Sequence, residues 1–266
     1  MNFKKSIGWL IVIIIVFSCQ KVPITGRNQL HIIPESELIS LSVVQYKETL
    51  QQSKIVTGTA DAAMVNKVGK KIADAAVSLM NQKGESDRLK GFAWEYHLLE
   101  DKMVNAWCLP GGKIAVYTGL LPISKTEAGL AVVMGHEVGH AIAQHGNERI
   151  TQQLAVQGGG MGLALYLSEK PAQTQEIFQT AYGYGAQYGA LLPFSRLQES
   201  EADKIGMVLM AIAGYDPAEA IGLWERMKAT PGAGDIPEFM STHPSDQTRI
   251  DNIRKFLPEA MKYYKK

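Results

Sequence analysis

The chain has 266 residues, of which 46% are hydrophobic and 20% are charged, and its formal net charge is +1. This length and composition predict a globular protein with a sizeable core, in one domain with or without appendages. No run of Lys or Arg forms a basic stripe, so nucleic acid is not expected as a partner.

The first eighteen residues have the pattern of a signal peptide. Lys4 and Lys5 precede an apolar run over 7–17, which is shorter than the roughly 20 residues of a membrane-spanning helix. Ser18-Cys19 resembles the cleavage site of bacterial lipoproteins, in which the cysteine is acylated. We therefore expect a signal peptide over 1–18 and a single domain over 19–266. An uncleaved N-terminal anchor is the alternative.

This N-terminus also predicts a location. A lipid on Cys19 would anchor the chain to a membrane of the bacterial cell envelope, facing the periplasm. Gln20 after the cysteine is not an acidic retention signal, so the outer membrane is favoured.

Hydrophobic periodicity and turn signals predict two helices followed by three short strands, at 35–52, 59–80, 92–99, 105–109 and 113–118. From Ser124 onward the pattern is helical, with one helix opened by Asp216-Pro217 and another over 245–257. Two Gly-rich segments, 157–167 and 182–189, are expected to form a helical hairpin that packs or moves. Together these elements predict an α+β fold, with a small sheet against several helices.

His136 and His140 lie four residues apart in the stretch MGHEVGHAIAQH. A capping box at Ser124–Glu127 predicts that this stretch belongs to a buried helix running to about Arg149. Residues four apart share one helix face, and imidazole is a good zinc ligand. Glu137 is displaced around the helix, where it can meet a water rather than the metal. The pattern His-Glu-x-x-His therefore indicates a metalloprotease.

A catalytic zinc needs a third protein ligand and one open position. A helix predicted from the capping box Ser195–Gln198 to Gly214 carries Glu199 and Asp203 one turn apart. One of the two can ligate the metal while the other orients a liganding histidine. Glu201 lies on another face of this helix. A solvated acidic face is the alternative interpretation.

The two motifs, His136-Glu-Val-Gly-His140 and Glu199-Ser-Glu-Ala-Asp203, resemble those of the membrane-associated gluzincin zinc metalloproteases. That family includes the CAAX prenyl proteases, HtpX and lipoprotein peptidases such as LoiP and BepA. Further blocks match in order: Val22-Pro-Ile-Thr-Gly-Arg27, the block from Asn105 to Ile114, Gly119-Leu-Leu121, and Thr242-His-Pro244 with Arg249. The resemblance covers most of the chain after the signal. It implies a mainly helical zincin-type domain.

The resemblance also assigns roles to individual residues. It implies one zinc ion per chain, held by His136, His140 and Glu199, with Asp203 behind a liganding histidine. It further implies that the strand from Asn105 and Ala106, or the one over 113–118, is the sheet edge to which an extended substrate adds.

His243 has three interpretations: a hydrogen-bond donor to the oxyanion, a fourth zinc ligand that keeps the enzyme latent, or a surface histidine. The resemblance favours a position near the metal. Arg249 is expected to brace that loop or to pair with an acidic neighbour. The remaining histidines, His31, His97 and His145, are expected to be structural.

The expected function is hydrolysis of peptide bonds by a zinc-activated water, with Glu137 as general base. The substrates would be polypeptides, such as misfolded or unassembled envelope proteins, and envelope-protein assembly factors would be partners. The alternative is a lipid-anchored, chaperone-like binding factor with a structural zinc and no proteolysis. Glu137 favours the enzyme, because a purely structural site needs no base.

Overall fold

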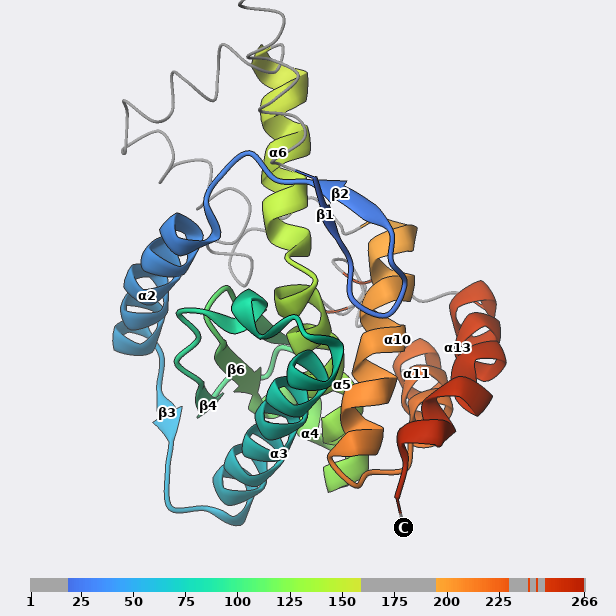
Figure 1. The fold of residues 1–266 in the computed structure, drawn as a ribbon. Coiled ribbons are helices and arrows are strands. Elements are labelled where there is room, and N and C mark those ends of the chain that lie inside the picture. Colours follow the sequence, from blue (N-terminus) through green and yellow to red (C-terminus); the bar gives the residue numbers. More distant parts are fainter. Residues whose placement is uncertain (1–18, 159–194, 230–238, 240–242, 244–246, 266) are drawn as a thin grey trace, which may run out of the picture.

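The computed structural model describes residues 19–158, 195–229, 239, 243 and 247–265. In this part of the chain, helix α2 covers one side of a four-stranded sheet, and helices α3 and α5 lie on the other side (Figure 1). The helices are α2 (Glu35–Gln52), α3 (Ala60–Lys83), α4 (Leu121–Ser124), α5 (Glu127–Ile142), α6 (His145–Gly158), α10 (Arg196–Ile212), α11 (Glu219–Ala229) and α13 (Gln247–Ala260), with 3-10 turns at Ser86–Leu89, Thr118–Leu120 and Met261–Tyr263. This arrangement confirms the predicted α+β fold.

The four-stranded sheet has the order β3-β4-β6-β5, formed by β3 (Ile55–Val56), β4 (Glu95–Leu99), β6 (Lys113–Tyr117) and β5 (Ala106–Leu109). Strand β6 pairs with β4 in parallel and with β5 in antiparallel orientation. The strand that begins at Ala106 is therefore an edge, whereas the strand over 113–117 is interior and cannot accept a further strand.

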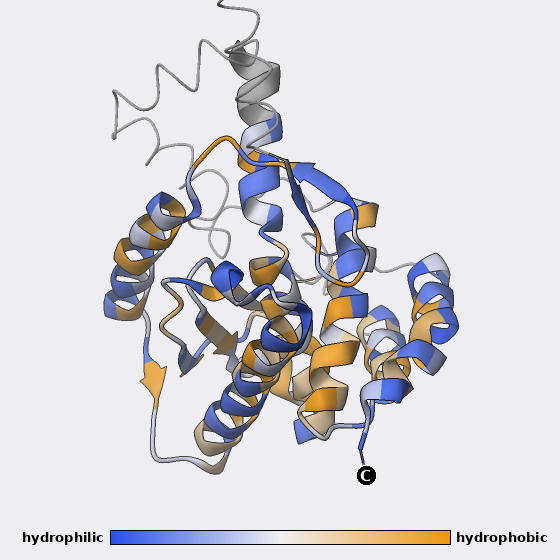
Figure 2. Ribbon diagram, viewed as in Figure 1, coloured by the Kyte–Doolittle hydropathy of each residue, from blue (hydrophilic) through white to orange (hydrophobic). Residues whose placement is uncertain are grey.

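A second, two-stranded sheet is formed by β1 (Cys19–Lys21) and β2 (Asn28–Leu30), which pair in antiparallel orientation. We call residues 19–30 the N-terminal hairpin. It lies beside α6 and α10, and both strands are hydrophilic (Figures 1 and 2). This hairpin was not predicted, because it lacks the alternating apolar residues by which strands are recognised.

Two predicted boundaries of the motif helix were wrong. Thr126, not Ser124, caps α5, because its hydroxyl accepts a hydrogen bond from the Gly129 N–H at 3.0 Å. The helix ends at Ile142 rather than continuing to residue 149, since Gln144 has a φ of +57°. A left-handed residue cannot continue a right-handed helix, so α6 starts in a new direction.

Helices α5 and α10 cross very closely at the position of the two motifs. A Cβ atom on Gly206 would lie 2.8 Å from the backbone nitrogen of His136, and one on Gly139 would lie 2.9 Å from the carbonyl oxygen of Ala202. Any larger side chain would separate the helices. Glycine at the crossing thus brings Glu199 within reach of the two histidines.

Other predicted elements agree closely with the structure. Helix α2 has the predicted bounds, α3 follows an N-cap at Thr59, and α10 begins with the predicted capping box of Ser195 and Gln198. Strand β4 begins at Glu95, later than predicted, and α11 begins two residues after Pro217.

Several predicted segments lie outside the described residues. These are the signal peptide over 1–18, almost all of the Gly-rich hairpin, which falls within 159–194, and the start of the helix predicted from 245. The division into 1–18 and a domain over 19–266 stays a prediction. Among the helices in the described ranges, none has the length and apolar character needed to cross a bilayer.

Candidate metal centre

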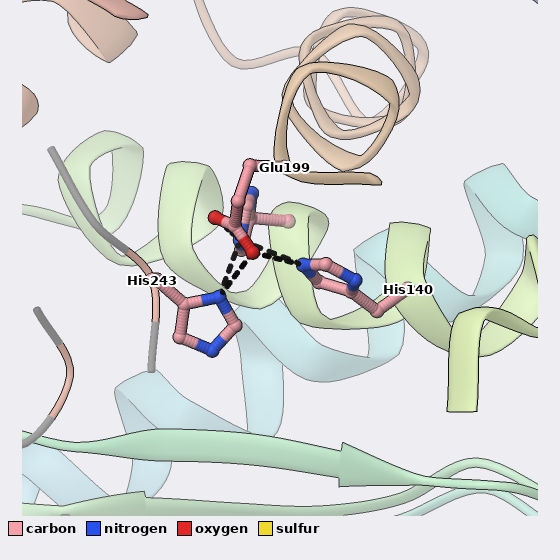
Figure 3. Close-up of side chains that lie close together, drawn as sticks. His140, Glu199 and His243 are labelled. Atoms are coloured by element: carbon pink, nitrogen blue, oxygen red, sulfur yellow. Dashed lines mark hydrogen bonds and ion pairs between the residues drawn. The ribbon is translucent and has the colours of Figure 1, made fainter. Parts of the chain in front are cut away.

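Four buried side chains bring their donor atoms together: His136 and His140 from α5, Glu199 from α10, and His243. Figure 3 shows how His140, Glu199 and His243 point toward one another. The Nε2 atoms of His136 and His140 lie 3.0 Å apart, and Glu199 Oε1 lies 3.2 Å from His140 Nε2. His243 Nδ1 lies 2.9 Å from Glu199 Oε1 and 3.1 Å from His136 Nε2. The structure therefore brings together three predicted ligands and the predicted fourth candidate.

This cluster fits a zinc ion. Zinc sites bind N and O donors at roughly 2.0–2.1 Å in tetrahedral geometry, which places neighbouring donors about 3.3 Å apart. The separations of 2.9 to 3.2 Å between Glu199 or His140 and their neighbours come close to that spacing. One carboxylate and three imidazoles are also a donor set that zinc prefers.

Asp203 lies behind His136, as predicted from its position one turn after Glu199. Its Oδ1 is 2.9 Å from His136 Nδ1, the nitrogen that does not face the other donors. A carboxylate in this position orients a liganding ring and makes it a better ligand. Arg249 and His136 hold the pKa of Asp203 low, although burial alone would raise it.

Arg249 connects the two acidic residues of α10. It donates to Asp203 through Nε and Nη2, at 2.8 and 2.7 Å, and its Nη1 lies 2.8 Å from Glu199 Oε2. Its guanidinium carbon is 3.4 Å from the centre of the Trp224 ring. Arg249 also donates to the carbonyl oxygen of His243 at 3.3 Å, so it braces the loop and pairs with acidic neighbours, two roles that the sequence left as alternatives.

Glu137 faces the same cluster without belonging to it. Its Oε1 is buried, has no hydrogen-bond partner among the described residues, and lies 3.6 Å from His243 Nε2. Burial raises the pKa of Glu137 to about 7; the nearby charge on Glu199 acts in the same direction, while His243 and Arg249 oppose it.

The segment that carries His243 also contacts the sheet edge. The Phe239 ring stacks on His243 with 4.6 Å between ring centres, and the Phe239 N–H donates to the carbonyl oxygen of Val104 at 3.1 Å. Val104 comes two residues before Ala106, the first residue of β5. Phe239 thus contacts both His243 of the metal cluster and the residue that precedes the edge strand.

Among the described strands, β5 pairs only with β6, which leaves its other side as an edge of the sheet. The carbonyl oxygens of Asn105 and Leu109 accept hydrogen bonds from Tyr117 and Gly112, so these residues face β6. Because backbone groups alternate in direction along a strand, those of Ala106 and Cys108 point to the open edge. The Ala106 N–H bonds to the side-chain oxygen of Asn105 at 2.8 Å.

Three residues near the centre were missed by sequence reasoning: His145, Glu201 and Arg27. His145 was taken as structural, but its Nδ1 lies 2.9 Å from His140 Nδ1, and its Nε2 lies 3.2 Å from Glu201 Oε2. Arg27 forms ion pairs with Glu201 and Glu148. The motif containing Arg27 was noticed, but nothing local showed where it would dock. Of the other two histidines taken as structural, His97 contacts the Tyr46 hydroxyl at 2.7 Å, whereas both ring nitrogens of the buried His31 lack a hydrogen-bond partner among the described residues.

Comparison with known proteins places this geometry in a family. Residues 60–257 match Peptidase family M48. The chain is 43% identical over 168 residues to the mitochondrial metalloendopeptidase OMA1 of Schizosaccharomyces pombe, covering 63% of this chain and 48% of the relative. It is 26% identical to human metalloendopeptidase OMA1, over 97% of this chain and 49% of the relative. It is also 24% identical to the metalloprotease YcaL of Escherichia coli, over 87% of this chain and 91% of the relative.

The chain spans about half the length of the OMA1 relatives that it matches. The comparisons confirm the predicted metalloprotease family, with zinc as its metal, and the relatives are named metalloendopeptidases or metalloproteases, as the predicted enzyme class requires.

The predicted location was wrong. Several relatives, with identities from 26% to 43%, are named mitochondrial proteins of eukaryotes, which points away from a lipoprotein of the bacterial outer membrane. The prediction was based on two lysines and a short apolar run. Charge and length of this kind do not show to which membrane a protein is directed. The predicted lipid on Cys19 and the predicted envelope partners depended on that location. The family match covers residues 60–257, which include both motifs and the α5–α10 crossing. The chain therefore belongs to Peptidase family M48.

Proposed function

We propose that this chain is a zinc-dependent endopeptidase that cleaves peptide bonds within extended polypeptides. Glu137 carries the proposal. A buried carboxylate costs free energy unless it is hydrogen-bonded, yet Oε1 of Glu137 has no hydrogen-bond partner among the described residues. It lies beside the donor cluster, 3.6 Å from His243 Nε2, without belonging to it, which is the place of a general base and has no purpose in a purely structural site.

The metal ligands and Glu137 have different roles in the proposed reaction. A zinc ion held by His136, His140 and Glu199 would polarise the scissile carbonyl and make a water acidic. Glu137 takes a proton from the attacking water and gives it to the leaving amine. A pKa of about 7 suits both steps, because a group that titrates near the working pH can accept and donate.

Strand β5 holds the substrate. An extended peptide pairs with the outward-facing backbone groups of Ala106 and Cys108, and the Ala106 N–H gives up its bond to the Asn105 side chain when it does so. Main-chain pairing keeps the peptide straight beside α5 whatever its sequence. Burial, with Glu137 contributing as a nearby charge, raises the pKa of the Cys108 thiol, so Cys108 acts here through its backbone and not as a nucleophile.

The arrangement described here is the resting form. His243 is the fourth donor, and a zinc ion with four protein ligands has no open position for a water. The Phe239 N–H donates a hydrogen bond to the carbonyl oxygen of Val104, which lies just before β5. Moving His243 away would open the metal, and moving Phe239 away would free the Val104 carbonyl, so the proposed role of His243 is that of a latency ligand.

Cleavage of unfolded casein tests this function. The zinc-loaded full chain is compared with His243→Ala, and with His97→Ala as a control, because His97 bonds to Tyr46 and does not belong to the metal cluster. We expect His243→Ala to cleave faster than the wild type, His97→Ala to equal it, and a zinc chelator to stop all three. Zinc-loaded protein that leaves casein and other unfolded polypeptides intact in every variant would contradict the endopeptidase and favour a binding factor.

A further inference from the structure

A second chain of contacts leads away from the metal cluster, starting at His140 rather than at His136. His140 Nδ1 lies 2.9 Å from His145 Nδ1, and His145 Nε2 lies 3.2 Å from Glu201 Oε2. All three side chains are buried. None of these contacts belongs to the ligand set or to the proposed base, so they need a separate explanation.

Glu201 is held by the N-terminal hairpin. Arg27 donates to it through Nε and Nη2, each at 2.9 Å, on the two carboxylate oxygens, and the Thr25 hydroxyl donates to Oε1 at 2.8 Å. These bonds hold both carboxylate oxygens, so Glu201 has a fixed orientation.

Arg27 also joins α6, which carries His145, to α10, which carries Glu199. Its Nη1 and Nη2 donate to Glu148 of α6 at 2.6 and 2.8 Å, while Nε and Nη2 reach Glu201 of α10. Gln198, at the start of α10, donates to Glu148 at 2.7 Å. Paired bonds from a planar guanidinium fix direction as well as distance.

The direction of each hydrogen bond follows from the metal. A neutral imidazole that ligates through Nε2 has its proton on Nδ1, so His140 donates from Nδ1. His145 must then accept at its own Nδ1 and carry its proton on Nε2, from which it donates to Glu201. The order His140 to His145 to Glu201 is therefore consistent at every step when His140 is a ligand.

We propose that the N-terminal hairpin is a positioning element of the metal centre, in which Arg27 acts through Glu201 and His145 to orient His140. The inference rests on zinc binding at the proposed site. The hairpin lies against α6 and α10 through polar contacts, and its strands are hydrophilic (Figures 1 and 2). Val22 of the hairpin is buried in the core, while Thr25 and Arg27 supply the polar contacts with α6 and α10.

The two liganding histidines are then supported from opposite ends of the chain. His136 contacts the carboxylate of Asp203 directly, and Arg249 near the C-terminus holds that carboxylate. His140 reaches the carboxylate of Glu201 through His145, and Arg27 holds it. Residues that orient a metal ligand in this way change metal affinity by roughly 10- to 100-fold.

The test is the dissociation constant for zinc, measured on the full chain by competition with a chelating dye. Arg27→Met is compared with Arg88→Met. Arg88 also holds the hairpin, by donating to the carbonyl oxygen of Lys21 at 2.6 Å, but it does not bond to Glu201. We expect Arg27→Met and the isosteric Glu201→Gln to weaken zinc binding by about tenfold or more, and Arg88→Met to leave it within about twofold.

A rescue separates positioning from folding. Gln at position 145 can accept from His140 and donate to Glu201, whereas Leu can do neither. We expect His145→Gln to keep near-normal zinc affinity and an unchanged visible spectrum of the cobalt-substituted protein, and His145→Leu to lose affinity and shift the spectrum.

Equal zinc affinity in Arg27→Met and Arg88→Met, or equal losses in His145→Gln and His145→Leu, would overturn the inference. A wild type that binds no zinc would instead overturn the proposed function, so the two failures are distinguishable.

Discussion

His145 Nδ1 lies 2.9 Å from His140 Nδ1, although five residues on a continuous helix would place the two side chains about 140° apart around the axis. The contact exists because α5 ends at Ile142 and Gln144 takes a φ of +57° before α6 begins. The break between α5 and α6 therefore places His145 against His140, beside the metal cluster.

The close crossing of α5 and α10 gives the first prediction. Gly206→Ala should destabilise the fold by about 1–3 kcal/mol, because its methyl group would meet the backbone at His136. It should also weaken zinc binding by moving Glu199 away from the histidines. Thermal unfolding and a zinc titration measure the two effects.

Gly222→Ala in α11 is the matched control. Its Cβ would meet the ends of two side chains, Arg226 at 3.2 Å and Glu219 at 4.0 Å, and no backbone atom. Replacing a helical glycine should therefore be neutral or stabilise by up to about 1 kcal/mol. A Gly206→Ala protein as stable as Gly222→Ala would contradict the crossing.

Asp203→Asn should weaken zinc binding by about 10- to 100-fold while the chain stays folded. Asparagine can still accept from His136, but it loses the ion pair with Arg249 and the charge that makes His136 a better ligand. Zinc affinity is measured beside the circular dichroism spectrum. Unchanged affinity would show that Asp203 has no influence on the metal.

His31 gives a prediction about pH. Its ring is buried, its two nitrogens have no hydrogen-bond partner among the described residues, and burial lowers its pKa from 6.5 to about 4. The unfolded chain then binds a proton that the folded chain does not, so stability is lost as the pH falls from about 6.5 towards 4. His31→Phe should remove this loss.

The measurement is the free energy of unfolding of the zinc-loaded protein at pH 7 and pH 5. His31→Phe should gain on the order of 1–2 kcal/mol relative to the wild type between these values. A difference that does not change with pH would mean that His31 is not the group responsible.

Local patterns predicted the parts of the site that depend on helix periodicity. His136, Glu137 and His140 share one helix, and Glu199 and Asp203 share another, so spacing alone placed each set on a face. The choice of Glu199 over Glu201 as the ligand came from the family resemblance. It agrees with the structure, in which Glu201 faces His145 instead.

The remaining parts depend on contacts between distant segments. Arg27 and Glu201 are 174 residues apart in sequence, and no pattern around either residue reveals the other. The end of α5 was missed because glutamine rarely takes a left-handed conformation, so Gln144 carries no stop signal. The edge position of β5 depended on strand order, which pairing with β4 and β6 decides.

The most direct measurement is the zinc content of Glu137→Gln beside its cleavage of casein, in the His243→Ala background so that latency does not mask activity. The account predicts one zinc ion per chain and no cleavage, because the base is lost while His136, His140 and Glu199 remain. Glu199→Gln in the same background should lose both. Cleavage by the Glu137→Gln protein, or loss of its zinc to the same extent as in Glu199→Gln, would contradict the roles assigned here.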